Sequence, residues 1–378
     1  MEKELTSLKE QILKIYDHLH THPEPSWKEY ATTQYLSEIL QREGFETKTF
    51  AEHTGVIGEK GKGGPVVGLR ADMDALWQEV EGKWQANHSC GHDAHMTIVM
   101  GTVLLLNRMG YEPTGRLKVI FQPAEEQGTG ALKFIEQGVI ADLEYLYGVH
   151  LRPIQELTSG QASPATLHGA GKFIQGQIKG RAAHAARPHL GINVIEVGAS
   201  LVKELAQVHT DPQIPASIKM TRFIAGDKGS NVIPANAEFS VDIRTQTNAA
   251  MTQILDKLPS IFKGVAEIYG AEVEWQVTAD TVAGELDETA TGILQHAVEK
   301  VLGVDGTMPP LVTPGGEDFH HYRHGKPTLH ATMLGLGCNL SPGLHHPQMS
   351  FDRMEIFNGI KILTSAVIET FGKVQGKE

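Results

Sequence analysis

The sequence Cys-Gly-His-Asp-Ala-His at Cys90–His95 and the sequence Gln-Pro-Ala-Glu-Glu at Gln122–Glu126 are the most informative stretches of this chain. The first places a thiol two residues from an imidazole, and the second pairs two carboxylates. Together with the downstream His150, these groups are ligands that zinc and similar metals accept. Two neighbouring glutamates can divide the work, one holding metal while the other moves protons. The combination predicts a catalytic metal centre.

Buried strands are predicted on either side of these motifs. Residues 65–70 and 115–122 read as strands of the buried parallel type, and 145–151 reads as a third strand. A helix is expected from the Cys90 motif to about Met109. The paired glutamates and His150 would then stand at the carboxyl ends of parallel strands, where open α/β sheets place active sites. Further elements are expected as helices at 4–20, 27–43, 286–303 and 353–373 and a strand at 45–50.

A different pattern occupies the middle of the chain. Strands are predicted at 170–179, 216–225, 236–245 and 271–277, and helices at 191–209 and 248–269. The order β-α-β-β-α-β describes a ferredoxin-like unit. We therefore predict an α/β metal-binding domain made of residues 1–167 and 285–378, with an inserted α+β lid domain at 168–284.

Composition and charge exclude several classes of protein. A chain of 378 residues with 40% hydrophobic residues can bury two large cores. The formal net charge of −12 is spread without a basic run, which argues against nucleic acid or an anionic membrane as partner. No apolar run is long enough to span a bilayer, and two cysteines cannot make a disulfide framework. We expect a cytoplasmic enzyme.

Seven motifs occur in order along nearly the whole chain. They are Arg70–Leu76, His88–Met96, Phe121–Glu126, Gly180–Gly191, Asn231–Pro234, Gly316–Phe319 and His345–Pro347. Together they resemble the aminoacylase and hippurate hydrolase type of di-metal amidohydrolases, a group that includes indoleacetyl-amino-acid hydrolases, N-acyl-diaminopimelate deacylases and carboxypeptidase-like enzymes. The resemblance implies a zinc-peptidase-like catalytic domain with a central, mostly parallel sheet and an inserted lid.

The resemblance also assigns roles at the metal centre. The implied metal ligands are Cys90, His92, Glu126, His150 and His345. Five ligands exceed what one tetrahedral ion needs, which suits two divalent ions with the Cys90 thiolate between them, and mixed ligation allows zinc, manganese, cobalt or nickel. Glu125 would be the general base that is not a ligand, and Asp74 would orient a ligand. His346 stays open as an alternative to His345.

The lid carries candidate substrate-binding groups. The resemblance gives His184 a polarising role on the substrate acyl oxygen or carboxylate, and the alternative is an ordinary loop histidine. Asn231 and Arg244 offer donors for a substrate carboxylate, and Glu317 is a candidate for the substrate pocket. Whether His184 serves its own subunit or a partner's is open, and an exposed edge strand of the lid would allow a homo-oligomer.

Several other residues are given structural interpretations. His95 is either structural or a support for a ligand, and Cys338 is expected in the core. His18, His20 and His22 are expected to mark the end of a helix. His320, His321 and His324 are expected to lie on the local surface.

The reading that unites these features is a metal-dependent amidohydrolase. It would cleave the amide bond of N-acyl amino acids or similar small peptide-like conjugates. A dipeptidase or carboxypeptidase that uses the same site is the alternative within hydrolytic chemistry. A non-catalytic metal- or ligand-binding protein is the alternative from another class, and it would have no need of a base at Glu125.

Overall fold

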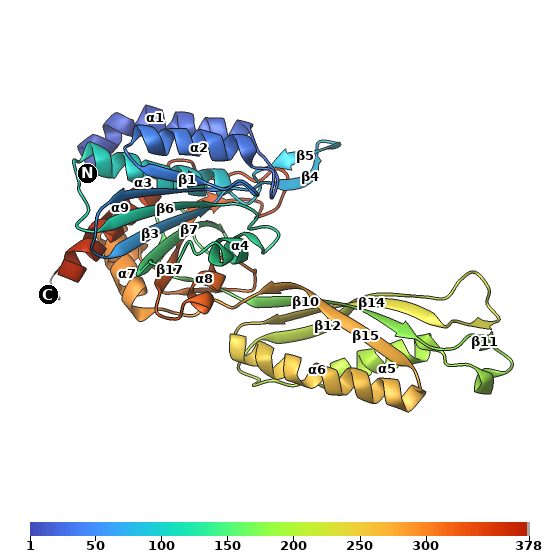
Figure 1. Cartoon of the computed structure of the whole chain (residues 1–378). Coiled ribbons are helices and arrows are strands. Elements are labelled where there is room, and N and C mark those ends of the chain that lie inside the picture. Colours follow the sequence, from blue (N-terminus) through green and yellow to red (C-terminus); the bar gives the residue numbers. More distant parts are fainter. Residues whose placement is uncertain (376–378) are drawn as a thin grey trace. The chain divides into compact units, whose positions relative to one another are not determined.

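The computed structural model describes residues 1–375, which form two compact units (Figure 1). Unit 1 comprises residues 1–167, 286–312 and those from 318 onward. Unit 2 comprises residues 168–285 and 313–317. The chain therefore leaves unit 1, builds unit 2 and returns, and each unit has a hydrophobic core of its own.

Unit 1 is built on a seven-stranded sheet in the order β1-β2-β6-β3-β7-β17-β8. Its strands are β1 (Glu46–Thr49), β2 (Val56–Gly61), β3 (Val66–Asp72), β6 (Arg116–Gln122), β7 (Tyr145–Pro153), β8 (Ala162–Ser163) and β17 (His330–Leu340). The neighbours β6, β3, β7 and β17 are parallel, whereas both edges of the sheet are antiparallel. The expected α/β class is confirmed, with the parallel strands at the centre of a mixed sheet.

Helices cover both faces of this sheet. They are α1 (Glu2–Thr21), α2 (Tyr30–Arg42), α3 (His92–Arg108), α4 (Gly130–Glu136), α7 (Glu288–Leu302), α8 (His320–Gly325) and α9 (Glu355–Gln375). Successive strand residues point to opposite faces, so that in β3 Val67 and Leu69 join the core under α1, α3, α7 and α9. Val66 joins the second core with Phe134 of α4 and Tyr322 of α8. The continuous apolar runs read from the sequence are explained by this burial on both faces.

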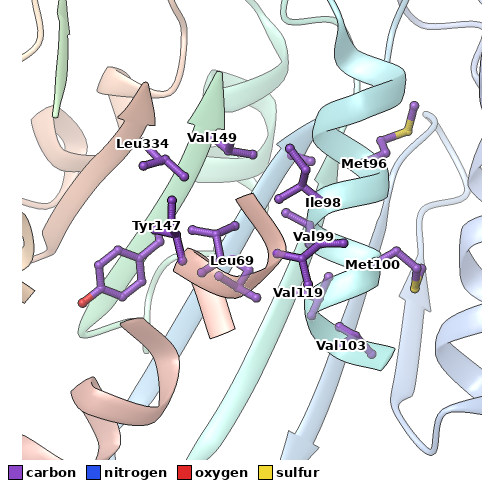
Figure 2. Close-up of a cluster of buried hydrophobic side chains, with 14 of the residues drawn as sticks. Leu69, Met96, Ile98, Val99, Met100, Val103, Val119, Tyr147, Val149 and Leu334 are labelled. Carbon is purple, nitrogen blue, oxygen red and sulfur yellow. The ribbon is translucent and has the colours of Figure 1, made fainter. Parts of the chain in front are cut away.

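Helix α3 connects the core to the candidate site. Its residues from His92 to Leu106 are all buried, and Figure 2 shows Ile98, Val99 and Val103 beside side chains of the sheet. The preceding Gly91 has a φ of 84°, a left-handed conformation that glycine adopts without a steric penalty. The sharp entry into the helix thus fixes His92 at its first turn.

Unit 2 has the β-α-β-β-α-β order that the sequence predicts. Its main elements are β10 (Ala170–Lys179), α5 (Val194–Leu205), β12 (Ala216–Ala225), β14 (Asn236–Thr245), α6 (Asn248–Tyr269) and β15 (Glu272–Thr281). The sheet order is β12-β14-β10-β15 and every pair is antiparallel. Asn193 and Thr247 cap the two helices by accepting backbone N–H groups, so α5 begins later than the sequence suggests.

Shorter elements complete the description. They are β4 (Leu76–Val80), β5 (Lys83–Asn87), β9 (Thr166–His168), β11 (Ala183–His184), β13 (Val232–Ile233), β16 (Leu311–Thr313) and 3-10 turns at Pro188–Leu190 and Val304–Gly306. Over residues 1–375, none of the helices combines the length and apolar character needed to cross a membrane.

We predict that Leu69→Ala destabilises unit 1 by about 2–5 kcal/mol, because Leu69 is wholly buried and the lost side chain leaves a cavity. Denaturant unfolding with a probe in unit 1 measures the change. Leu132→Ala is the matched control, since Leu132 of α4 is 42% exposed and should cost no more than about 0.5 kcal/mol. Equal losses in the two variants would contradict this account of the core.

Candidate metal centre

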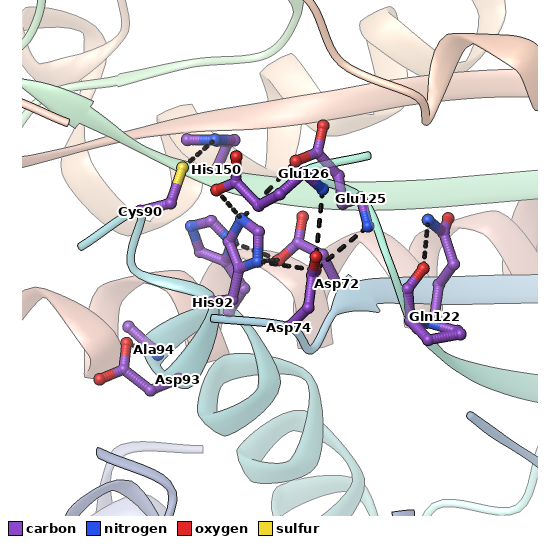
Figure 3. A network of polar contacts seen from close by, with 12 residues as sticks. Asp72, Asp74, Cys90, His92, Asp93, Ala94, Gln122, Glu125, Glu126 and His150 are labelled. Carbon is purple, nitrogen blue, oxygen red and sulfur yellow. Dashed lines mark hydrogen bonds and ion pairs between the residues drawn. The ribbon is translucent and has the colours of Figure 1, made fainter. Parts of the chain in front are cut away.

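The candidate ligands of unit 1 lie at the carboxyl ends of the parallel strands (Figure 3). Cys90 stands just before α3, and Glu126 follows β6. His150 lies near the end of β7, and His345 follows β17. The location agrees with the general rule that open α/β sheets carry their sites at this edge.

Short distances connect these side chains into one cluster. Cys90 Sγ lies 3.7 Å from His150 Nε2, and Glu126 Oε1 lies 3.8 Å from His92 Nε2 and 3.4 Å from His345 Nε2. Cys90 belongs to two trios of possible ligand atoms, one with His92 and His150 and the other with Glu126 and His345. The structure therefore brings all five predicted ligands together, with the thiol shared between two groups.

Two buried atoms of the cluster fit a bound cation. His92 Nε2 and Glu126 Oε1 are buried and have no hydrogen-bond partner. A buried polar atom without a partner costs free energy, and native proteins contain few of them. The Asp74 carboxylate, 3.3 Å from His92 Nδ1, favours the proton on that nitrogen and leaves the Nε2 lone pair directed toward Glu126. A nitrogen lone pair and a carboxylate oxygen at this spacing suit one metal ion.

The electrostatics of the cluster also favour cations. Burial by itself would lower the pKa of His92, but the neighbouring Asp72, Cys90 and Asp74 raise it well above its usual value. The neighbouring Cys90 and Glu126 favour the charged imidazole and raise the pKa of His345 to about 10. Negatively charged groups thus outweigh positive ones around these two imidazoles.

Asp74, which the sequence analysis expects to orient a ligand, lies in contact with His92 and with the loop of the glutamate pair. Its two carboxylate oxygens accept the backbone N–H groups of Glu125 and Glu126, both at 3.1 Å. The same carboxylate lies beside His92 and accepts a hydrogen bond of 2.6 Å from Ser26 Oγ. The Asp74 side chain therefore sets the distance between the start of α3 and the loop that carries the glutamate pair.

A buried ion network beside the cluster was missed by the sequence analysis. Arg70 is wholly buried and donates to Asp72 Oδ2 at 2.6 Å and to Asp318 Oδ1 at 2.7 Å. His95 Nδ1 lies 2.7 Å from Asp72 Oδ1, while its Nε2 accepts the Leu151 N–H at 2.9 Å. His95 is therefore occupied on both nitrogens by protein groups, which favours its structural interpretation. The available signal was Arg70 itself, a cation within an apolar strand.

Glu125 lies at the edge of the cluster. Its side chain is 9% exposed, and its Oε2 lies 4.0 Å from His92 Nε2, the atom that also faces Glu126. Its Oε1 accepts the Asp318 backbone N–H at 3.4 Å. The carboxylate is thus directed to the candidate ligands while its neighbour Glu126 takes the position between two histidines.

His345 and His346 have different environments. His345 has a φ of 65° and donates its backbone N–H to Ser89 O at 2.7 Å, which brings its ring to Glu126. Both side chains are exposed, but His346 Nδ1 accepts the N–H of Gln348 instead of lying near Glu126. Of the two histidines, His345 is the one that joins the cluster.

The candidate substrate residues of unit 2 do not all lie together. His184 is exposed on β11, and the next residue, Ala185, donates its N–H to Asn231 O at 2.9 Å. Arg244 lies near the opposite end of β14 and pairs with Asp242 at 2.8 Å. The eight-residue rise from Asn236 to Arg244 spans roughly 25 Å. Arg244 therefore lies far along β14 from Asn236, the end of the strand that follows β13, and Asn231 and Arg244 stay separate candidates for contact with a substrate carboxylate.

The remaining sequence-based placements have mixed outcomes. Glu317 is buried within the short segment of unit 2 at 313–317. The surface placement of His320 and His321 is wrong, because α8 packs these residues inward together with Phe319 and Tyr322. Cys338 is wholly buried, as expected, and His22 directly follows the end of α1.

Known proteins resemble this chain over nearly its full length. The N-acetylcysteine deacetylase of Bacillus subtilis is 31% identical over 358 residues, covering 90% of this chain and 92% of the relative. Thermostable carboxypeptidase 1 of Saccharolobus solfataricus is 29% identical over 370 residues, covering 93% and 92%. The YXEP protein of Bacillus subtilis, described as a dinuclear metal binding peptidase from the M20 family, superposes with a TM-score of 0.82 at 27% identity, covering 97% of this chain and 99% of that one.

The family model for peptidase family M20/M25/M40 matches residues 68–369, a span that contains the whole cluster of candidate ligands. These matches agree with the seven ordered motifs and with the arrangement of the site. The chain belongs to the peptidase family M20/M25/M40.

Proposed function

We propose that this protein hydrolyses the amide bond of N-acyl amino acids or similar small conjugates, using a pair of divalent ions. The observation that carries the proposal is the position of Glu125. Its carboxylate lies outside both trios that share Cys90, but its Oε2 is 4.0 Å from His92 Nε2, in a further group with His92 and Glu126. A site for metal binding alone has no use for such a group, whereas hydrolysis needs a base that can release the proton again.

The residues of the cluster would hold two ions, with Cys90 common to both. The proposed ligands are Cys90, His92, Glu126, His150 and His345, and this donor set accepts zinc, manganese, cobalt or nickel. When bound, the ions would lower the pKa of a water molecule and polarise the acyl oxygen. The thiolate ligand suits a reducing compartment, and we therefore assign the activity to the cytoplasm.

Glu125 would carry the proton during the reaction. Its Oε2 faces His92, and its Oε1 is held by the Asp318 N–H, so the carboxylate is directed to one place. It would accept a proton from the attacking water and deliver it to the nitrogen of the leaving amino acid. Asp74 would hold the backbone of this base through the Glu125 N–H.

Unit 2 would supply substrate contacts. His184 pairs with Val232 across the β11–β13 ladder, and the next residue, Ala185, donates its N–H to Asn231 O, so His184 and Asn231 are two exposed polar residues at one end of unit 2. We propose His184 as the donor to the acyl oxygen or carboxylate, with Arg244 and Glu317 as separate contacts. The edge strands β12 and β15 have one unpaired side each in the sheet of unit 2, which is a route to a homo-oligomer.

A carboxypeptidase or dipeptidase activity is the second candidate. The observation that favours it is the similarity to a thermostable carboxypeptidase over 93% of this chain. Both reactions cleave an amide bond next to a free carboxylate, and the same base would serve either. They differ only in the group on the acyl side of the bond.

We predict that the metal-loaded protein hydrolyses N-acetyl, N-benzoyl or indoleacetyl amino acids faster than dipeptides. We also predict that Glu125→Gln loses at least about 100-fold in kcat while retaining its metal. A substrate panel with metal analysis on both proteins measures this. Loss of metal together with activity would show that Glu125 is a ligand. Turnover of dipeptides alone would favour the second candidate.

We predict that Cys90→Ala weakens the binding of both ions, because one thiol belongs to both ligand trios. Metal titration of the purified apoprotein, followed by calorimetry, gives the two affinities. Cys338→Ala is the matched control, since Cys338 is a buried thiol of the core and should leave metal affinity unchanged. Binding of two ions to Cys90→Ala with wild-type affinity would reject the shared role.

We predict that His184→Ala keeps its full metal content but loses about 3 kcal/mol of transition-state stabilisation, on the order of 100-fold in kcat/KM. Steady-state kinetics on the metal-replete variant measure the loss. His189→Ala is the control, because His189 is another exposed histidine close by in the sequence. A change below about twofold in His184→Ala would reject the donor role.

A further inference from the structure

The loop after β6 is held by buried carboxylates at three successive residues. The N–H of Ala124 donates to Glu29 Oε1 at 3.0 Å, and the N–H groups of Glu125 and Glu126 donate to the two oxygens of Asp74. Hydrogen bonds to an ionised carboxylate, as at Asp74, are about twice as strong as those between neutral groups. The backbone that carries the proposed base and its neighbouring ligand is therefore fixed at each residue.

A single connection between α1 and α2 supports this loop at several points. Ser26 Oγ donates to Asp74 Oδ2 at 2.6 Å, and Trp27 Nε1 donates to Thr129 Oγ1 at 3.2 Å. Glu29 belongs to the same connection, and its second oxygen accepts a hydrogen bond of 2.5 Å from Thr54 Oγ1. Residues 26–29 thus contact the loop both before and after the glutamate pair.

The backbone at this contact is strained on both sides. Ala124 has a φ of 53° and Trp27 has a φ of 63°, a left-handed region that residues other than glycine rarely adopt. Such conformations persist only where surrounding interactions over-determine them, and they concentrate at functional sites. Ala124 immediately precedes the proposed base. Its carbonyl accepts the N–H groups of Thr129 and Gly130, and its own N–H donates to the Glu29 carboxylate.

Glu29 is an expensive residue to place here. It is wholly buried, and burial raises its pKa to about 7, with the nearby Asp74 charge acting in the same direction. A hydrophobic side chain would avoid this desolvation cost. A hydrophobic side chain, however, could not accept the hydrogen bond of the Ala124 N–H. The need for an acceptor accounts for the carboxylate at this position.

We propose that Glu29 is a positioning residue, which holds Ala124 in its left-handed conformation and thereby directs the Glu125 carboxylate to the metal cluster. Glu29 is not one of the candidate ligands, and it acts through the backbone N–H of Ala124. The inference rests on the proposed function in so far as Glu125 is the base. The hydrogen bond itself can be tested without any reaction.

The experiment compares Glu29→Leu, Glu29→Gln and Glu24→Leu. Leu is similar in size to Glu but accepts no hydrogen bond, whereas Gln keeps an acceptor oxygen for Ala124 and an amide that can donate to Thr54. Glu24 is the matched control, because its carboxylate lies in the same connection but accepts from Ala31 and Thr32 at the start of α2. Metal content, kcat, KM and amide hydrogen exchange over residues 121–127 are measured for each.

We expect Glu29→Leu to exchange its amides at 121–127 on the order of 10- to 100-fold faster, in the apoprotein as well as with metal bound. Its kcat should fall by a similar factor while KM changes less than about threefold and the metal content stays full. Glu29→Gln should recover most of both losses. Glu24→Leu should leave the exchange of this segment and kcat as in the wild type.

The proposal would be overturned if the amides at 121–127 of Glu29→Leu exchanged at the wild-type rate. It would also be overturned if kcat fell as much in Glu24→Leu as in Glu29→Leu. Should Glu29→Leu fail to fold, Thr54→Val is the second test, because it releases Glu29 Oε2 while keeping the side chain's shape. Faster exchange at 121–127 in Thr54→Val supports the positioning role of Glu29, and unchanged exchange overturns it. A wild-type protein that hydrolyses no N-acyl amino acid would reject the proposed function, whereas the exchange data would still decide the role of Glu29.

Discussion

The buried carboxylate of Asp74 is the group on which the arrangement of the site depends. It lies beside His92 at the start of α3 and accepts the N–H groups of Glu125 and Glu126 after β6. These elements are joined only through a long stretch of chain, so chain continuity does not set their distance. A carboxylate has two oxygens with several lone pairs, and it can therefore orient an imidazole and two backbone amides together.

A second constraint is the charge balance beneath the cluster. Arg70 is wholly buried between Asp72 and Asp318, and His95 completes the hydrogen bonding of Asp72. Burying an ion pair costs desolvation free energy that its attraction only partly offsets, so such a network is weak evidence for stability. Its physical effect is directional, because each charged group has one arrangement that satisfies its partners. The network fixes the end of β3 relative to the first turn of α3, next to the candidate ligands.

The two units differ in how they present their functional candidates. In unit 1 the candidates come from several strand ends and most are buried, so their positions are set by packing. In unit 2 the candidates His184 and Asn231 are exposed on a two-stranded ladder, and Arg244 lies near the far end of β14. Buried ligands suit a preorganised metal site, whereas exposed donors suit groups that meet a substrate.

Local pattern was enough to predict the elements that carry the site. The strands at 66–72, 116–122 and 145–153 are apolar runs, and burial on both faces is visible in the residues themselves. Strand β17 was missed because Gly335 and Gly337 interrupt its pattern. At Gly337 a Cβ atom would lie 2.1 Å from Thr158 O, so this glycine is required by a neighbour that is remote in sequence.

The sequence by itself determined the chemistry of this protein: a thiol, three imidazoles and a glutamate pair, ordered on motifs that specify a family. Only the tertiary structure decided which groups meet. It distinguished His345 from His346 by a left-handed backbone and a hydrogen bond to Ser89, and it placed Arg244 near the end of β14 that lies farther from β13 and Asn231. It also paired Arg70 with Asp318 and Glu29 with Ala124. Residue type limits what a side chain can bind, but the partner of a buried charge lies far away in the chain and leaves no local signal.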